Sequence, residues 1–282
     1  MPYRGSVAAD MSLNRAAEVA ISWADQEGWN PGLDDSARFL AADPGAFMAT
    51  ERDGEVVATV SCALYGDSYA FIGFYIVRAD LRGRGIGAPL FQRALERAAG
   101  RAVGLDGVPA GRASYERRGF VLAHRNVRWR TMGGGERLAE LVPLSFVPFG
   151  ELRAFDAAVF GVDRERFLRA WVDRPDGHAL AHVRGGRLVG YGVLRPCRVG
   201  AKIGPLFADD PDVAQALFAG LLAAAGPRTE VFIDIPAANE RTAALHAGRA
   251  MEPSFETARM YLNGRPAEDV QRVFGVTSFE FG

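Results

Sequence analysis

The pattern of apolar and polar positions in the first half of the chain predicts two helices followed by a meander of strands. Residues 14–26 and 36–42 carry apolar side chains at helical spacing. The runs 55–65 and 69–77 are rich in valine, isoleucine and aromatic residues, and the short stretch Gly66-Asp67-Ser68 separates them. This arrangement is typical of two strands joined by a hairpin turn.

A further helix is predicted from residue 87 to residue 99. Its apolar side chains recur with a period of about 3.6 residues, so that one face of the helix is apolar. We expect that face to pack against the sheet.

The second half of the chain repeats the order of the first. DGEVVATVSC at 53–62 aligns with GGRLVGYGVL at 185–194, and IGFYIV, which begins at Ile72, aligns with IGPLFA, which begins at Ile203. After a helix in each copy, VGLDGVP is matched by VFIDIP, which pairs Asp106 with Asp234. Three matches in one order, at a slowly drifting offset, indicate a duplication.

The glycines at 133–135 mark the connection between the copies. We therefore predict a domain at residues 1–131, a linker at 132–143 and a second domain at 144–282. The order of elements predicts an α/β (α+β) fold in which each domain has a mixed, mostly antiparallel central sheet flanked by helices.

Composition narrows the function classes. The chain has 282 residues with 33 basic and 34 acidic side chains, a balance that predicts neither nucleic acid nor an anionic membrane as partner. The opening residues lack the apolar core of a secretion signal, and the apolar run 216–225 is too short to span a bilayer. We expect a cytoplasmic protein in which Cys62 and Cys197 are reduced, packed thiols and no metal is bound.

The most informative segment is Arg82-Gly83-Arg84-Gly85-Ile86-Gly87, which leads from an apolar strand into the helix predicted at 87–99. Its glycines let backbone amides approach a ligand, and the helix start presents unpaired N–H groups and the positive end of the helix dipole. Arg82 and Arg84 add positive charge. The combination is suited to a pyrophosphate.

Two other interpretations of this segment remain open. It is also compatible with a tight turn that carries two solvated arginines. Residues 83–88 fit the dinucleotide fingerprint GxGxxA as well, with Asp106 near the place of its ribose-binding acid. Because residues 78–82 intervene after the strand, and a hairpin precedes it, the dinucleotide interpretation is the weaker one.

Two signatures in order give a resemblance to a known family. Residues 82–87 fit the pattern of Arg or Gln, two variable residues, Gly, one variable residue, then Gly or Ala; residues 113–120 read Ala-Ser-Tyr-Glu-Arg-Arg-Gly-Phe. In both, the chain resembles the GNAT (GCN5-related) N-acetyltransferase superfamily. The paired arrangement looks like the bacterial tandem-GNAT subgroup, which carries a degenerate C-terminal acetyltransferase-like domain.

The resemblance implies that residues 1–131 bind acetyl-CoA as cosubstrate and transfer its acetyl group, by direct attack, to a primary amine of a small molecule or peptide. The oligomeric state stays open between a monomer and a homodimer. The resemblance also places the acyl group beside Ile76 and Val77, and the pyrophosphate on Arg82, Gly83, Arg84, Gly85, Ile86, Gly87 and Ala88.

Tyr115 matches the family's usual catalytic partner of the leaving thiolate, and a phenol stays protonated at neutral pH. Alternatively, the Tyr115 ring has only a structural role, in which it packs a short helix that ends at Gly119.

The base that deprotonates the amine is the open question. Many family members carry a glutamate on the strand corresponding to 71–77, where this chain has no acid. Asp106, Asp25 and Glu27 are alternatives, and so is an amine that arrives neutral. The acceptor itself is expected to meet Trp29, Asn30, Tyr65 and Asp106.

The second copy is expected to bind no second cofactor. Residues 209–213 read Asp-Asp-Pro-Asp-Val where the first copy has its glycines and arginines, and carboxylates there repel a pyrophosphate and cap a helix instead. Such a degenerate copy can complete the acceptor pocket, with Asp234, Glu256 and Glu280 attracting an amine. The missing base and the degenerate copy leave a second function open, a catalytically silent acyl-CoA-binding sensor.

Overall fold

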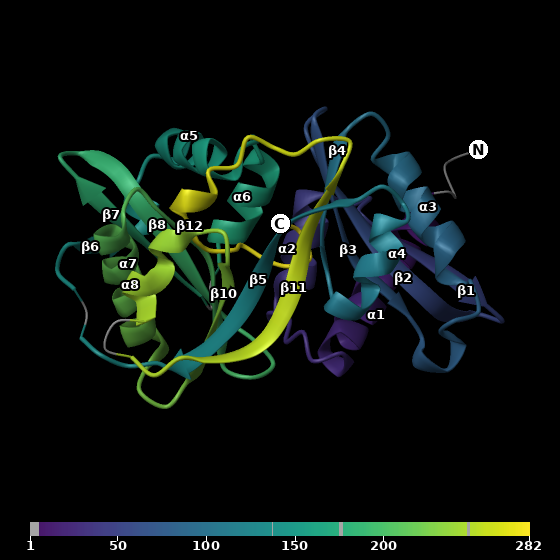
Figure 1. Ribbon diagram of the computed structural model, residues 1–282, viewed down its shortest axis with the longest axis horizontal. Coiled ribbons are helices and arrows are strands. Elements are labelled where there is room, and N and C mark those ends of the chain that lie inside the picture. Colours follow the sequence, from purple (N-terminus) through teal and green to yellow (C-terminus); the bar gives the residue numbers. More distant parts are fainter. Residues whose placement is uncertain (1–5, 137, 175–176, 247–248) are drawn as a thin grey trace.

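The computed structural model describes residues 6–136, 138–174, 177–246 and 249–282. A 12-stranded sheet runs through the molecule in the order β1-β2-β3-β4-β11-β5-β10-β9-β8-β7-β6, and β12 pairs with β9 (Figure 1). The strands are β1 (Phe47–Arg52), β2 (Glu55–Tyr65), β3 (Tyr69–Val77), β4 (Ala102–Gly107), β5 (Val121–Met132), β6 (Leu141–Pro143), β7 (His178–Arg184), β8 (Arg187–Pro196), β9 (Ala201–Ala208), β10 (Glu230–Pro236), β11 (Glu252–Leu262) and β12 (Val273–Gly275).

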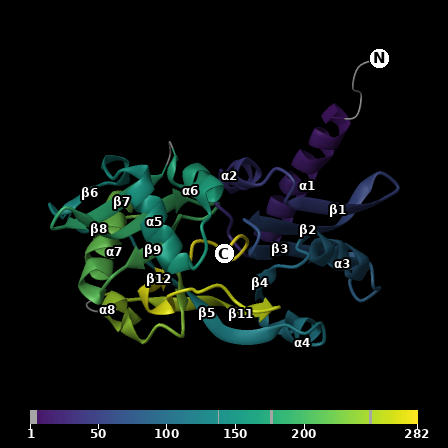
Figure 2. The same cartoon turned by 90° about the horizontal axis from the view of Figure 1, so that it is seen from above.

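Helices cover both faces of this sheet. They are α1 (Ser6–Gln26), α2 (Asp35–Ala42), α3 (Gly87–Arg97), α4 (Arg112–Glu116), α5 (Phe149–Phe160), α6 (Glu165–Val172), α7 (Pro211–Ala225) and α8 (Ala243–His246). Figure 2 shows α1 and α3 on opposite faces of the strands β1 to β3. The apolar face of α3 buries Leu90, Phe91 and Ala94 against that sheet, as its periodicity predicts. In the described part of the chain, none of the helices is both long and apolar enough to cross a membrane.

The two halves of the chain exchange a strand. β11, from the second half, lies between β4 and β5 of the first half, and β5 lies between β11 and β10. Each half is therefore completed by a strand of the other. The prediction of a mixed, mostly antiparallel sheet flanked by helices is confirmed, but the two predicted sheets are one. Because the strands interleave, the domain bounds 1–131 and 144–282 stay a prediction.

Candidate active site

The strands β3 and β4 run in parallel and then diverge. Their pairing extends only from Tyr69↔Ala102 to Ile72↔Leu105. Just beyond this point β3 is bulged, since its register with β2 steps from Gly73 opposite Ser61 to Ile76 opposite Thr59. The divergence leaves the β4-facing backbone edge of the last residues of β3 outside the ladder.

Phe74, in the bulge, has a φ of 47°. Left-handed backbone costs a bulky residue of order 1–3 kcal/mol, and such strain collects at functional sites. The Thr59 hydroxyl stabilises the bulge because it donates a hydrogen bond of 2.9 Å to the Phe74 carbonyl. The bulge is thus held in place by the neighbouring strand.

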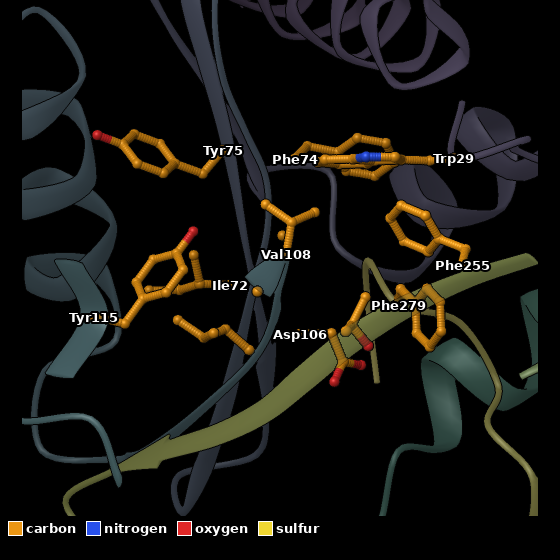
Figure 3. Close-up of a pocket in the computed structure, with 13 residues that line it drawn as sticks. Trp29, Ile72, Phe74, Tyr75, Asp106, Val108, Tyr115, Phe255 and Phe279 are labelled. Carbon is orange, nitrogen blue, oxygen red and sulfur yellow. The ribbon is translucent and has the colours of Figure 1, made fainter. Parts of the chain in front are cut away.

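A pocket opens where the two strands part (Figure 3). Its lining combines the ends of β3 and β4 with the helix α4 and with β11 and the segment 276–282 of the second half. The lining residues are Trp29, Ile72, Gly73, Phe74, Tyr75, Leu105, Asp106, Gly107, Val108, Tyr115, Phe255, Thr257 and Phe279.

The segment 276–282 reaches this pocket by crossing β3. Its residues are buried throughout, and a Cβ atom at Gly73 would lie 2.1 Å from the backbone oxygen of Glu280. Only glycine at position 73 allows that close approach. The crossing brings Phe279 into the pocket wall.

Tyr115 lies on α4, and its ring packs against Phe91 and Phe120, with centroids 5.7 and 6.1 Å away. Figure 3 shows its hydroxyl directed toward the space between Tyr75 and Val108. Burial, together with the nearby Tyr75 and against a lowering by Arg118, raises the pKa of Tyr115 to about 12. The phenol therefore keeps its proton at neutral pH and is able to donate it.

The glycine-rich turn precedes α3, as predicted. Gly83 and Gly85 have φ values of 75° and 76°, in the left-handed region that glycine adopts at little cost. Ile86 is buried and anchors the turn, and α3 begins at Gly87. The first N–H groups of a helix have no partner within it, so the turn and the helix start together offer donors to an anion.

The two arginines of the turn differ. The Arg82 Nε donates to the Val77 carbonyl at 2.9 Å, and its guanidinium also pairs with Glu27. Arg82 therefore braces the turn against the end of β3. Arg84 is exposed and forms no hydrogen bond or ion pair with the described residues, which leaves its charge available. Ile76 and Val77 line a second hollow together with Arg82 and α1.

Of the four predicted acceptor residues, the pocket contains Trp29 and Asp106. Asn30 lies beside the opposite half, where its side-chain amide exchanges two hydrogen bonds of 2.9 Å with the backbone of Val199. The Tyr65 hydroxyl donates to the Phe281 carbonyl at 2.6 Å and faces a different cavity. Neither of these two side chains is among the lining residues.

Asp106 is fully engaged. Its two carboxylate oxygens accept hydrogen bonds of 2.8 and 2.7 Å from the Arg259 guanidinium, and Asn126 donates a third at 2.8 Å. The side chains of Asp106 and Arg259 are 0% and 2% exposed. Both oxygens of this buried carboxylate are thus occupied, and Asp106 is the counter-charge of a buried guanidinium.

The acids predicted to attract an amine lie elsewhere. Asp234 is bound by Arg128 in a buried ion pair, and Glu256 is a surface residue 3.3 Å from Arg125. Glu280 is buried behind the pocket, and burial raises its pKa. None of the three lines the pocket.

The second copy fills its own strand divergence. The parallel pairing of β9 and β10 ends at Ile203↔Ile233, and beyond it β12 pairs with β9 at Leu206 and Phe207. The Asp210 carboxylate accepts a 2.9 Å hydrogen bond from the Val213 N–H, which confirms its predicted capping of a helix. A strand of the chain thus occupies the position that corresponds to the pocket of the first copy.

Sequence reasoning missed Phe74, Phe255, Thr257 and Phe279 as pocket residues. Side chains alternate between the two faces of a strand, so the sequence of β11 indicates that Phe255, Thr257 and Arg259 lie on the same face. The exchange of β11 into the first half carries no such signal. In residues 6–136, 138–174, 177–246 and 249–282, no group of three or more His, Cys, Asp or Glu side chains is arranged to hold a metal ion.

Comparisons with known proteins agree with this geometry. Residues 14–120 match the "Acetyltransferase (GNAT) family", and residues 152–275 match the "Acetyltransferase (GNAT) domain". Holothin acyltransferase from Pseudoalteromonas sp. (strain SANK 73390) is 30% identical over 267 residues, which cover 94% of this chain and 91% of that protein.

Two solved structures share the fold over nearly the whole chain. A protein from Pyrococcus horikoshii assigned as an acetyltransferase has a TM-score of 0.81 and 25% identity, with 95% of this chain and 93% of that chain covered. A tandem GNAT protein from the clavulanic acid biosynthesis pathway has a TM-score of 0.61 and 15% identity, with 92% and 97% covered. The chain belongs to the GNAT superfamily, as a tandem member whose relatives perform acyl transfer.

Proposed function

We propose that this protein is an N-acetyltransferase that moves the acetyl group of acetyl-CoA to a primary amine, with the chemistry in residues 1–131. One observation carries the proposal. The parallel strands β3 and β4 part beside Tyr115, and the glycine-rich turn follows β3 after a short 3₁₀ helix at Ala79–Leu81.

The residues present fit acetyl-CoA. The edge of β3 beyond Ile72 offers backbone groups that the β4 ladder leaves free, and they are suited to the amide groups of the pantetheine arm. The segment Arg82–Ala88 offers the N–H groups of a glycine turn and a helix start, and Arg84 adds a free positive charge. The thioester supplies an activated acetyl group.

Tyr115 serves as the proton donor to the departing sulfur. Its raised pKa keeps the phenol protonated, and its position in the pocket wall is on the α3–α4 side of the divergence. A positioned general acid typically contributes a factor of about 10² to 10⁴ in rate. The ladder with β4 ends before the bulge at Phe74, so in this proposal the backbone N–H groups on that edge of β3 bind the oxyanion that forms during attack.

No carboxylate of this pocket is free to take the proton of an ammonium ion, because the one acid among its described lining residues, Asp106, is held by Arg259. In this proposal the amine reaches the thioester already neutral. The same observation supports the alternative of a catalytically silent acyl-CoA sensor.

The test compares thiol release from acetyl-CoA, with a panel of amines, for the wild type, Tyr115→Phe and Tyr261→Phe. Tyr261 bonds Glu268 at 3.2 Å and lies outside the pocket lining, so it is a matched loss of a hydroxyl. We expect Tyr115→Phe to lower kcat by about 10²-fold or more while acetyl-CoA still binds. Tyr261→Phe should keep kcat.

Equal kcat for Tyr115→Phe and the wild type would remove Tyr115 from the mechanism. Acetyl-CoA binding without thiol release for any amine would favour the sensor. Absence of binding would refute both functions.

A further inference from the structure

We propose that the acceptor is a flat aromatic amine of low basicity, with its nitrogen attached directly to the ring. This inference rests on the proposed function and names the substrate class of the same pocket. It follows from the walls of the pocket, its charge and a buried hydroxyl in its lining that has no partner among the described residues.

The wall opposite Tyr115 is aromatic. Figure 3 shows Trp29, Phe74, Phe255 and Phe279 on one side of the pocket and Tyr75 and Tyr115 on the other. The Phe255 and Phe279 rings are 6.2 Å apart between centroids, with planes tilted by 39°. Rings gathered in this way favour a flat π system, which packs against them in stacked or edge-to-face geometry.

Aromatic rings also attract cations, but here a cation of the protein already lies against two of the rings. The Arg128 guanidinium lies 4.9 Å from the Phe279 centroid and 5.6 Å from that of Phe255. This guanidinium is paired with Asp234, so it occupies the faces of these rings that an ammonium ion would use without adding a net charge of its own.

The charge of the lining leads to the same conclusion. Asp106 is the one acid among the described lining residues, and Arg259 neutralises it in a buried bidentate pair. An alkyl ammonium would meet no free carboxylate there. A ring amine carries no charge at neutral pH because its lone pair is delocalised into the ring.

The pocket also offers a buried hydrogen-bonding group on the side of β11. The Thr257 Oγ1 is buried in the pocket lining, and it has no hydrogen-bond partner among the described residues. Leaving a buried hydroxyl unpaired is costly, and a polar atom of the acceptor would recover that cost by bonding it. The acceptor therefore has a polar atom on the edge of its ring.

A ring amine also resolves the absence of a base. Its nitrogen lone pair attacks the thioester carbon, the C–N bond forms and the C–S bond breaks. One proton leaves the nitrogen, and one proton reaches the sulfur through Tyr115, which recovers its own from the solvent. The products are an amide and the CoA thiol, and no oxidant or reductant takes part.

Matched amine pairs test the proposal. Aniline and benzylamine differ by one methylene that separates the nitrogen from the ring, and 5-aminoindole and tryptamine make the same comparison on a larger ring. With wild-type protein and acetyl-CoA, we expect kcat/KM to be about tenfold or more higher for the ring amine of each pair. Mass spectrometry of the product locates the acetyl group on the nitrogen.

A variant pair ties the preference to this pocket. Phe255→Leu should raise KM for the ring amines by about threefold to tenfold and leave the Kd of acetyl-CoA unchanged, since the lost stacking is worth about 0.5–1.5 kcal/mol. Phe146→Leu is the control, because Phe146 is 74% exposed and lies outside the pocket lining.

Preference for benzylamine and tryptamine would overturn the inference and leave the proposed function standing. An unchanged KM for the ring amines in Phe255→Leu would do the same. Absence of thiol release with all four amines and a wider panel would instead overturn the proposed function, and the inference with it.

Discussion

Asp106 of β4 is bound by Arg259 of β11, a strand that comes from the opposite half of the chain. The relationship is reciprocal. Asp234 of β10, the counterpart of Asp106 in the duplication, is bound by Arg128 of β5 at 2.6 and 2.9 Å. Each half thus supplies a buried aspartate to an arginine of the other.

The pair with Arg259 explains why Asp106, one of the acids that the sequence offered as a base, is unsuited to that task. The Asp106 carboxylate is the counter-charge of a buried guanidinium at the contact between the two halves, and its oxygens are already bound by Arg259 and Asn126. Asp106 therefore stabilises the exchange of strands that brings Phe255 and Thr257 into the pocket. Its effect on acceptor binding is indirect.

The first prediction concerns this pair. Asp106→Asn removes the counter-charge of Arg259, so we expect the free energy of unfolding to fall by about 3–5 kcal/mol in urea titrations. Glu116→Gln is the control, because it breaks an exposed pair with Arg112, and such pairs contribute about 0–1 kcal/mol. A variant that keeps its stability but loses activity at neutral pH would identify Asp106 as the base.

The second prediction concerns Thr257. Thr257→Val removes a buried hydroxyl that has no partner among the described residues, so the free energy of unfolding should stay constant or rise. The KM of a well-bound acceptor should rise about fivefold, since a hydrogen bond contributes about 1 kcal/mol. Thermal unfolding and steady-state kinetics measure the two effects. A loss of stability without a change in KM would show that the Thr257 hydroxyl has only a structural role.

The third prediction is a pH profile. The pKa of Tyr115 is raised to about 12, so its phenol remains protonated above pH 10, where an ordinary tyrosine is already half ionised. With a ring amine, which is neutral throughout, kcat should stay flat from about pH 7 to about pH 10 and fall only as pH approaches about 12. A decline centred near pH 9 would show that another group donates the proton.

Local structure was predictable from the sequence to the extent that local signals exist. The strands β2 and β3 have the predicted bounds because Gly66, at φ 58°, turns the chain between two apolar runs. The glycine turn before α3 was also predictable, because its glycines are a local signal for a turn. α1 begins at Ser6, earlier than the apolar pattern indicated.

The acceptor side of the pocket was not predictable in this way. Which strand lies beside β4 depends on contacts between residues more than 140 positions apart, such as Asp106 with Arg259. Asn30 and Tyr65 illustrate the same limit. Both are near the expected region in sequence, but their polar atoms are used by Val199 and Phe281 of the second half.

The central claim is that the first half holds the cofactor and that the second, whose strand divergence is filled by β12, does not. Calorimetric titration with acetyl-CoA tests it in the wild type, Gly85→Ala and Gly54→Ala. The two glycines have φ values of 76° and 79° and equally open surroundings, but only Gly85 belongs to the turn. The account predicts one acetyl-CoA per chain, weakened by Gly85→Ala and unaffected by Gly54→Ala. Two sites per chain, or equal binding by both variants, would contradict it.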